Sequence, residues 1–169
     1  MGEAALLDAA QLADVEAIRA VAMRYAHGLD RLDAEWMRSA YWPEAIDDHG
    51  VFVGNAFEFV DRCIDSHPRW RSTMHCIFNH QVQLDSATRA RGEIYNVTYL
   101  FAREGSGVDV WVGRYLDAYE RRGHEWRIIH RVCVHEGTSH FDAPVMPIAA
   151  EKFRQGEFDR PSVARPLGP

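Results

Sequence analysis

The first long apolar segment of the chain ends in YAHGLDRLD, residues 25–33, which places a carboxylate where an apolar face should continue. In a helix of 3.6 residues per turn, Asp30 projects at nearly the same angle as Leu12 and lies at the edge of the apolar face. A buried carboxylate without a partner would cost several kcal/mol. Either Asp30 has a partner from another segment, or the helix frays at Gly28 and Asp30 caps the next element.

His75 is a candidate partner because it opens the longest segment with alternating apolar residues. Strand periodicity predicts that His75, Ile77 and Asn79 share one face and that His80 lies on the opposite face. An imidazole changes its charge near neutral pH, so a buried histidine beside a carboxylate can act as a general base. A single strand histidine can equally be a satisfied core or surface residue.

Metal and nucleophile chemistry have weaker support. The segment HRVCVH, residues 130–135, holds nitrogen and sulfur donors, but only Cys133 and His135 share a face, and no second ligand cluster follows. We therefore predict no metal site. The three cysteines lack a CxxC spacing, and no GxSxG, GxGxxG or GxxxxGK[ST] motif occurs. Cofactor-free acid–base chemistry by His, Asp, Tyr and Arg remains.

The elements that must position these residues fall into two groups. Helical periodicity and caps predict helices early in the chain, at 12–29, 33–41 and 55–66. Period-two alternation rich in β-branched and aromatic residues predicts long strands at 72–84, 92–102, 108–120 and 126–135, with a shorter first strand within 45–54. The connectors between the long strands are short, so neighbours in sequence should pair antiparallel. This order indicates an α+β fold with helices on one face of a strongly curved sheet.

The 169 residues fit a single domain, which we place at 1–140. Residues 141–169 are rich in proline and predict an arm that crosses the surface or reaches a neighbouring subunit. The net charge of −6 and the absence of a basic run disfavour nucleic acid as a partner. The acidic N-terminus and the absence of a long apolar run predict a cytoplasmic protein that does not enter membranes.

Three segments together resemble the SnoaL-like branch of the nuclear-transport-factor-2-like superfamily, which has a cystatin-like fold. They are RYAHGLDRLDAEWMRSAYWPEA, STMHCIFNHQVQLD and GRYLDAYERRGHEWRIIHRV, and the resemblance extends from Leu12 to Ser139. The branch includes scytalone dehydratase, hexachlorocyclohexane dehydrochlorinase and bile-acid dehydratases. The resemblance implies a cone of curved sheet closed by helices, with an apolar pocket between them.

The resemblance also implies roles for particular residues. Asp30 and His75 correspond to a catalytic dyad, Arg131 to an arginine on the last strand, and Tyr25 to a tyrosine five residues before the aspartate. Thr98 stands near the position where some members place an acid, which a threonine cannot replace. The segment DDHG, residues 47–50, either adds Asp48 and His49 to the pocket or forms a solvated turn. Further pocket residues implied are Trp42, Asn79, Tyr95, Thr98, Trp111, Tyr115, Cys133 and His135.

The expected function is that of a cofactor-independent lyase acting on an apolar cyclic or aromatic molecule. His75 would remove a carbon-bound proton, and Asp30 would orient the imidazole and stabilise its protonated form. Elimination, most often dehydration, would follow. A retro-aldol variant that expels formaldehyde from a diaryl propane-diol would use the same groups. An isomerase or polyketide cyclase, and a ligand-binding module without activity, remain alternatives. By analogy we expect a homo-oligomer, with a trimer favoured over a dimer.

Overall fold

The computed structural model describes residues 6–142, 148–153 and 158. Within them a sheet of six strands has the order β2-β1-β6-β5-β4-β3. The strands are β1 (Tyr41–Asp48), β2 (Val53–Asn55), β3 (Trp70–Leu84), β4 (Arg89–Ala102), β5 (Gly107–Arg122) and β6 (Glu125–Asp142). The helices are α1 (Ala9–Arg31), α2 (Ala34–Arg38) and α3 (Ala56–Ser66), followed by the short turns η1 (His67–Arg69) and η2 (Ala150–Lys152).

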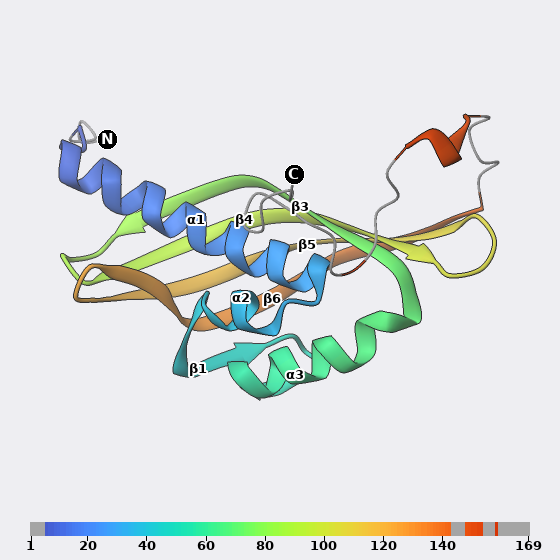
Figure 1. The fold of residues 1–169 in the computed structure, drawn as a ribbon. Helices are drawn as coiled ribbons and strands as arrows, with labels where there is room; N and C mark the ends of the chain where they lie inside the picture. Colours follow the sequence, from blue (N-terminus) through green and yellow to red (C-terminus); the bar gives the residue numbers. More distant parts are fainter. Residues whose placement is uncertain (1–5, 143–147, 154–157, 159–169) are drawn as a thin grey trace, which may run out of the picture.

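The sheet is antiparallel except for the pairing of β1 with β6, which is parallel. Figure 1 shows α1 running across one face of this curved sheet. The predicted α+β class, with helices preceding a mostly antiparallel sheet, is confirmed. Among the described residues, no helix combines the length and the apolar character that crossing a bilayer requires.

Some predicted boundaries differ from those observed. The second helix ends at Arg38 rather than at residue 41, and β1 begins at Tyr41, earlier than expected. Ala45 and Asp47 are buried whereas Glu44 and Ile46 are exposed, an alternation that is typical of a strand. β6 continues to Asp142, so it includes the first two residues of the predicted arm. Most of that arm lies outside the described residues.

Strand β3 follows the predicted alternation of side chains as far as Ile77, and the alternation then changes. A register shift separates Ile77 from His80 in the pairing of β3 with β4. Asn79 is consequently exposed, and His80 lies on the inner face, where its Nε2 is 3.3 Å from the Tyr119 hydroxyl. The predictions that Asn79 shares a face with His75 and that His80 lies opposite are therefore wrong, because a bulge reverses the alternation.

The helix α1 remains regular through Gly28 and ends at Arg31, where Leu32 adopts a left-handed conformation with φ of 52°. The predicted alternative of fraying at Gly28 does not occur. Gly28 is needed for a close approach of α2, because a Cβ at this position would lie 2.5 Å from the backbone nitrogen of Met37. This approach helps to hold the last turn of α1, which carries Asp30.

We expect Gly28→Ala to lower the free energy of unfolding by roughly 1–3 kcal/mol, because the added methyl meets backbone atoms that cannot move aside. Denaturant titration followed by circular dichroism measures this change. Gly137→Ala is the matched control, since no atom lies within 4 Å of a Cβ built there. If both variants had the stability of the wild type, the close approach would not constrain α1.

Candidate active site

Asp30 lies in the last turn of α1 and is 8% exposed. Its Oδ1 accepts hydrogen bonds from Thr73 Oγ1 at 2.7 Å and His75 Nδ1 at 2.7 Å. Its Oδ2 accepts a third from the backbone N–H of His75 at 2.8 Å. These contacts supply the partner that a buried carboxylate requires, and they join α1 to β3.

These contacts also determine the tautomer of His75. A carboxylate only accepts hydrogen bonds, so the proton on His75 is on Nδ1, and Nε2 carries the free lone pair. Among the described residues, no group forms a hydrogen bond with Nε2. The side chain is 6% exposed, which shields the ring from bulk water. His75 is thus arranged as an oriented base.

Electrostatics keep Asp30 ionised. Burial acts to raise its pKa, but the hydrogen bonds from His75 and Thr73 and the charge of His75 outweigh this effect and lower the pKa below the ordinary value. Asp30 is therefore negatively charged and can accept a hydrogen bond from the His75 imidazole. It can stabilise an imidazolium without taking the proton itself.

A second histidine–aspartate pair lies on β1 and in the turn after it. Asp47 is fully buried, and its Oδ1 contacts His49 Nδ1 while its Oδ2 accepts a hydrogen bond from the Tyr41 hydroxyl at 2.7 Å. The His49 ring stacks on Phe59 with a centroid distance of 4.1 Å. Their contacts with the buried side chains of Tyr41 and Phe59 place both groups on the inner side of the sheet.

Tyr25 lies between the two pairs. Its hydroxyl is 3.5 Å from His49 Nε2, and its ring packs edge-on against His75 with centroids 6.4 Å apart. The ring centroid of Tyr115 is 5.6 Å away. Burial raises the pKa of Tyr25 well above its ordinary value, so the side chain remains a neutral phenol.

Arg131 is fully buried, and its guanidinium makes two hydrogen bonds of 2.7 Å to Asp117, its neighbour across β5 and β6. The guanidinium also lies between two rings, 4.3 Å from the centroid of Tyr25 and 4.1 Å from that of Tyr115. Its Nη1 is 3.5 Å from the Tyr41 hydroxyl. Arg131 thus links both tyrosines to Asp117, and each of its three nitrogens has a hydrogen-bond partner.

Comparison with known families assigns the chain to a family. A sequence profile described as the SnoaL-like domain matches residues 10–132. The chain belongs to the SnoaL-like domain family. Comparison with curated proteins yielded no significant match for this SnoaL-like chain.

Solved structures with a similar fold include two dehydrochlorinases. A hexachlorocyclohexane dehydrochlorinase of type 2 superposes with a TM-score of 0.72 at 18% identity, covering 82% of this SnoaL-like chain and 95% of its own. The type 3 enzyme from Novosphingobium barchaimii gives 0.71 at 20% identity, covering 80% and 97%. A protein from Novosphingobium aromaticivorans described as a putative scytalone dehydratase gives 0.68 at 17% identity, covering 80% and 91%. These likenesses show the fold.

Several residues expected in the pocket of this SnoaL-like domain lie close to the two pairs. Thr98 is 5% exposed and pairs across the sheet with both His75 and Trp111. Trp111 stacks against Tyr115 with centroids 6.4 Å apart. Cys133 is half-buried beside Tyr115, and His135 is exposed, 6.0 Å from the Trp111 ring.

Other expected residues are placed elsewhere. Trp42 lies between Arg122 and Arg127, 4.5 Å and 4.7 Å from their guanidinium carbons, and its indole N–H donates to the Glu120 carbonyl. Tyr95 is 48% exposed and lies beside Arg114. Asp48 accepts the Gly50 N–H at 2.9 Å and closes the turn. The acid of DDHG that reaches the site is therefore Asp47, not Asp48.

Sequence reasoning missed Asp47, Tyr41, Thr73 and Asp117. The spacing of Asp47 and His49 was the available signal, because residues two apart on a strand lie on one face. Asn96 was also missed. It is 1% exposed, and both polar atoms of its amide lack a hydrogen-bond partner among the described residues. The sequence gives no signal for that property, since it depends on what surrounds the side chain.

The described residues contain no group of three His, Cys, Asp or Glu side chains arranged to hold a metal ion. Burial raises the pKa of Cys63 and of Cys133 to about 12, so both remain thiols near neutral pH. Neither has the properties of a nucleophile.

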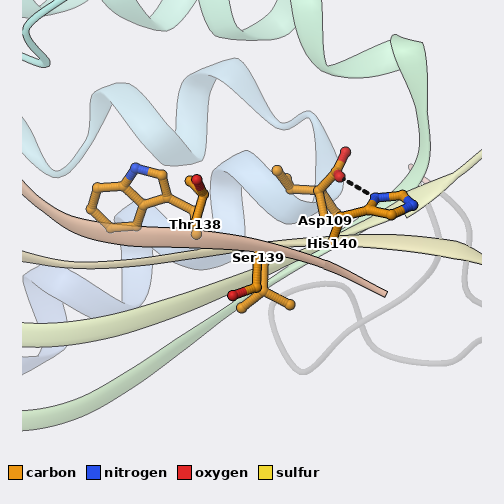
Figure 2. A pocket seen from close by; sticks show the side chains of 7 residues that line it. Asp109, Thr138, Ser139 and His140 are labelled. Carbon is orange, nitrogen blue, oxygen red and sulfur yellow. Dashed lines mark hydrogen bonds and ion pairs between the residues drawn. The ribbon is translucent and has the colours of Figure 1, made fainter. Parts of the chain in front are cut away.

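A hollow of ≈ 380 Å³ lies at the end of the sheet next to Trp111. Its lining comprises Leu100, Asp109, Val110, Trp111, Thr138, Ser139 and His140. Figure 2 shows Asp109 and His140, joined by a 2.7 Å hydrogen bond, on one side of the strands with Thr138, whereas Ser139 lies on the other side. Trp111 belongs both to this hollow and to the aromatic cluster around Tyr115.

The stability of the domain should fall as the pH drops from about 6.5 toward 4, because burial lowers the pKa of His80 to about 4. The unfolded chain takes up a proton in this window and the folded chain does not, so acid favours unfolding. Over this pH range we expect the free energy of unfolding of His80→Gln to fall by roughly 1–3 kcal/mol less than that of the wild type. Thermal melts at several pH values measure it, with His124→Gln, an exposed turn residue, as control. Identical profiles for wild type and His80→Gln would contradict the assignment.

Proposed function

We propose that this SnoaL-like domain is a cofactor-independent lyase in which His75 removes a carbon-bound proton and an elimination follows. The observation that supports this proposal best is the buried contact of 2.7 Å between Asp30 Oδ1 and His75 Nδ1. It orients the imidazole and leaves Nε2 as the proton acceptor.

In this mechanism Nε2 takes the proton from a carbon next to an electron-withdrawing group. The resulting imidazolium is stabilised by the ionised Asp30. Thr73 has no part in the proton transfer, but it holds Asp30 in place through its 2.7 Å hydrogen bond. Loss of the hydroxyl group from the neighbouring carbon completes the elimination. In a retro-aldol variant Nε2 would instead take the hydroxyl proton of a CH2–OH group, the C–C bond would break with its electron pair kept by the remaining carbon, and formaldehyde would leave.

Tyr25 and Arg131 act in different ways. A neutral phenol donates a hydrogen bond, so Tyr25 is suited to stabilise developing charge on an oxygen. Two N–H groups of Arg131 donate to Asp117, and the guanidinium lies between the two rings. We therefore assign it a positioning role, in which it holds Tyr25 and Tyr115 rather than contacting the leaving group.

The charges predict a neutral substrate with an apolar ring. The buried charged residues of the described chain are Asp30, Asp47, Asp117 and Arg131, an excess of carboxylates that would repel an anion. The rings of Tyr25, Tyr115, Trp111 and Phe59 supply aromatic surface around them. The hollow beside Trp111 is a candidate approach to these rings.

A direct test uses the aldol adduct of acetophenone and benzaldehyde, together with a diaryl propanediol and hexachlorocyclohexane. Purified protein is incubated with each in deuterium oxide, and nuclear magnetic resonance detects exchange of the acidic carbon-bound proton and formation of the alkene. We expect turnover of at least one compound, with an unchanged rate in EDTA. Absence of both exchange and alkene across this panel would favour a ligand-binding module.

The expected homo-oligomer would cover the outer face of β3, β4 and β5. This face exposes apolar side chains, including Met74, Tyr95, Tyr99, Val112 and Leu116. We expect Tyr99→Asp to shift the particle mass toward the monomer in mass photometry. Glu104→Lys, which changes a charge at the exposed turn after β4, is the control. A wild-type monomer at micromolar concentration would contradict this expectation.

A further inference from the structure

The pair Asp47–His49 has no role in the proton abstraction assigned to His75, yet it repeats the construction of the first pair. In each, a buried carboxylate contacts the Nδ1 of a histidine and also accepts a hydrogen bond from a hydroxyl. For Asp47 the hydroxyl is that of Tyr41, and for Asp30 it is that of Thr73. The two imidazoles are thus oriented by the same kind of contact.

Both pairs contact the same side chain. The Tyr25 ring packs against His75, and its hydroxyl lies 3.5 Å from Nε2 of His49. The side chain of His49 is 15% exposed, so the ring is sheltered but not sealed. The two histidines therefore belong to one site and approach it from different elements, His75 from β3 and His49 from the turn after β1.

Three contacts hold the His49 ring in one orientation. Phe59 stacks on one face of the imidazole, Asp47 contacts Nδ1, and Nε2 is directed to Tyr25. Asp47 is fully buried and cannot obtain hydrogen bonds from bulk solvent. Because a carboxylate only accepts hydrogen bonds, Asp47 holds the ring by Nδ1, and a proton on Nε2 is positioned for donation toward Tyr25.

We propose that Asp47–His49 is the acid of the reaction and that it delivers a proton to the leaving oxygen while His75 acts as the base. This inference rests on the proposed elimination and adds a second catalytic group to it. The substrate class that needs it has a hydroxyl or alkoxyl leaving group, since such groups depart poorly as anions.

His75 Nε2 takes the proton from the activated carbon, and the electron pair of that C–H bond moves onto the neighbouring carbonyl group to give an enolate. The enolate then returns this pair to form the C=C bond. The bond between the neighbouring carbon and oxygen breaks, and its electron pair stays on the oxygen. That oxygen takes the proton from His49 Nε2, directly or through the Tyr25 hydroxyl, and leaves as water. Proton exchange with solvent then restores both histidines.

The test separates the two proton transfers. One substrate is the aldol adduct of acetophenone and benzaldehyde, and the other is its nitrophenyl ether, which gives the same alkene but releases a stable anion. For His49→Gln we expect elimination of the hydroxyl compound to fall about 10²-fold or more, with exchange of the carbon-bound proton within about threefold of wild type. Elimination of the nitrophenyl ether should also remain within about threefold of wild type.

Other variants complete the design. His75→Gln should lose exchange and both eliminations together. Asp47→Asn should reproduce the pattern of His49→Gln and guards against a folding defect specific to one substitution. His80→Gln, a half-buried histidine of the same sheet that contacts Tyr119, is the matched control and should retain all three activities.

Two results would overturn the proposal. The first is equal loss of exchange and of both eliminations in a folded His49→Gln variant, which would place His49 with the base. The second is full activity of that variant on the hydroxyl compound. Failure of the underlying lyase proposal gives a different signature, because the wild type itself would then show neither exchange nor elimination with either compound.

Discussion

Replacing His75 by glutamine should lower kcat by about 10²- to 10⁴-fold, the usual contribution of a positioned general base. The substitution removes the lone pair that accepts the proton but leaves Asp30 with two of its three hydrogen bonds, those from Thr73 and the residue 75 backbone. The melting temperature should therefore change by only a few degrees. Steady-state kinetics on any substrate found active, paired with thermal melts, measures both quantities.

Asp30→Asn tests the orientation of the base separately. An amide that presents an N–H to Nδ1 forces the imidazole proton onto Nε2 and removes the proton acceptor, as for triads in which the acid is changed to its amide. We expect kcat to fall by a similar factor with KM little changed. Unfolding of both variants, or activity close to wild type in either, would indicate that the pair is structural.

Arg131→Met should have the largest effect on stability, a loss of about 3–5 kcal/mol, because it leaves Asp117 as a buried carboxylate without its cation. Tyr119 would still donate to Asp117 at 2.7 Å, but one neutral hydrogen bond does not compensate the charge. The two tyrosine rings would also lose the guanidinium between them. Denaturant unfolding of the purified variant gives the free energy.

The double variant Arg131→Met with Asp117→Leu is the control for this interpretation. Buried ion pairs can often be replaced by apolar residues at little cost, so the double variant should regain most of the stability. It should not regain full activity, because Tyr25 and Tyr115 lose their positioning contact. If the single variant were as stable as wild type, the pair would not matter to the fold.

The elements were predictable because each has a strong local signature. The helix at 56–66 begins after the cap Asn55 and ends before Pro68, and its predicted range of 55–66 differs by one residue. The long strands were located from period-two alternation, and their observed ends extend beyond the predicted ones by as much as seven residues, at β6. The extra length comes from pairing between strands, which periodicity in one segment does not report.

The candidate site was predictable only in part for a related reason. Asp30 was marked by its place on the helix, and His75 by its place on a strand, because both features are local in sequence. The bulge after Ile77 and the bond from Arg131 to Asp117 depend on how strands are aligned with one another. Asp47 was overlooked in favour of its neighbour Asp48, because the resemblance that pointed to DDHG did not show which of the two acids faces the interior.

The parallel pairing of β1 with β6 sets Asp47 opposite Arg131, and the antiparallel pairing of β5 with β6 sets Asp117 on the other side of the same arginine. Arg131 thus has an acidic residue on each side in the sheet. Of these two acids, Asp117 accepts its hydrogen bonds. We therefore expect a reversal of charge at one position of the row Asp47, Arg131 and Asp117 to preserve the fold only together with matching reversals at the other two positions. In natural variation the row would then be inherited as one unit, whereas His49 could be gained or lost independently, and with it the proton donor that we propose.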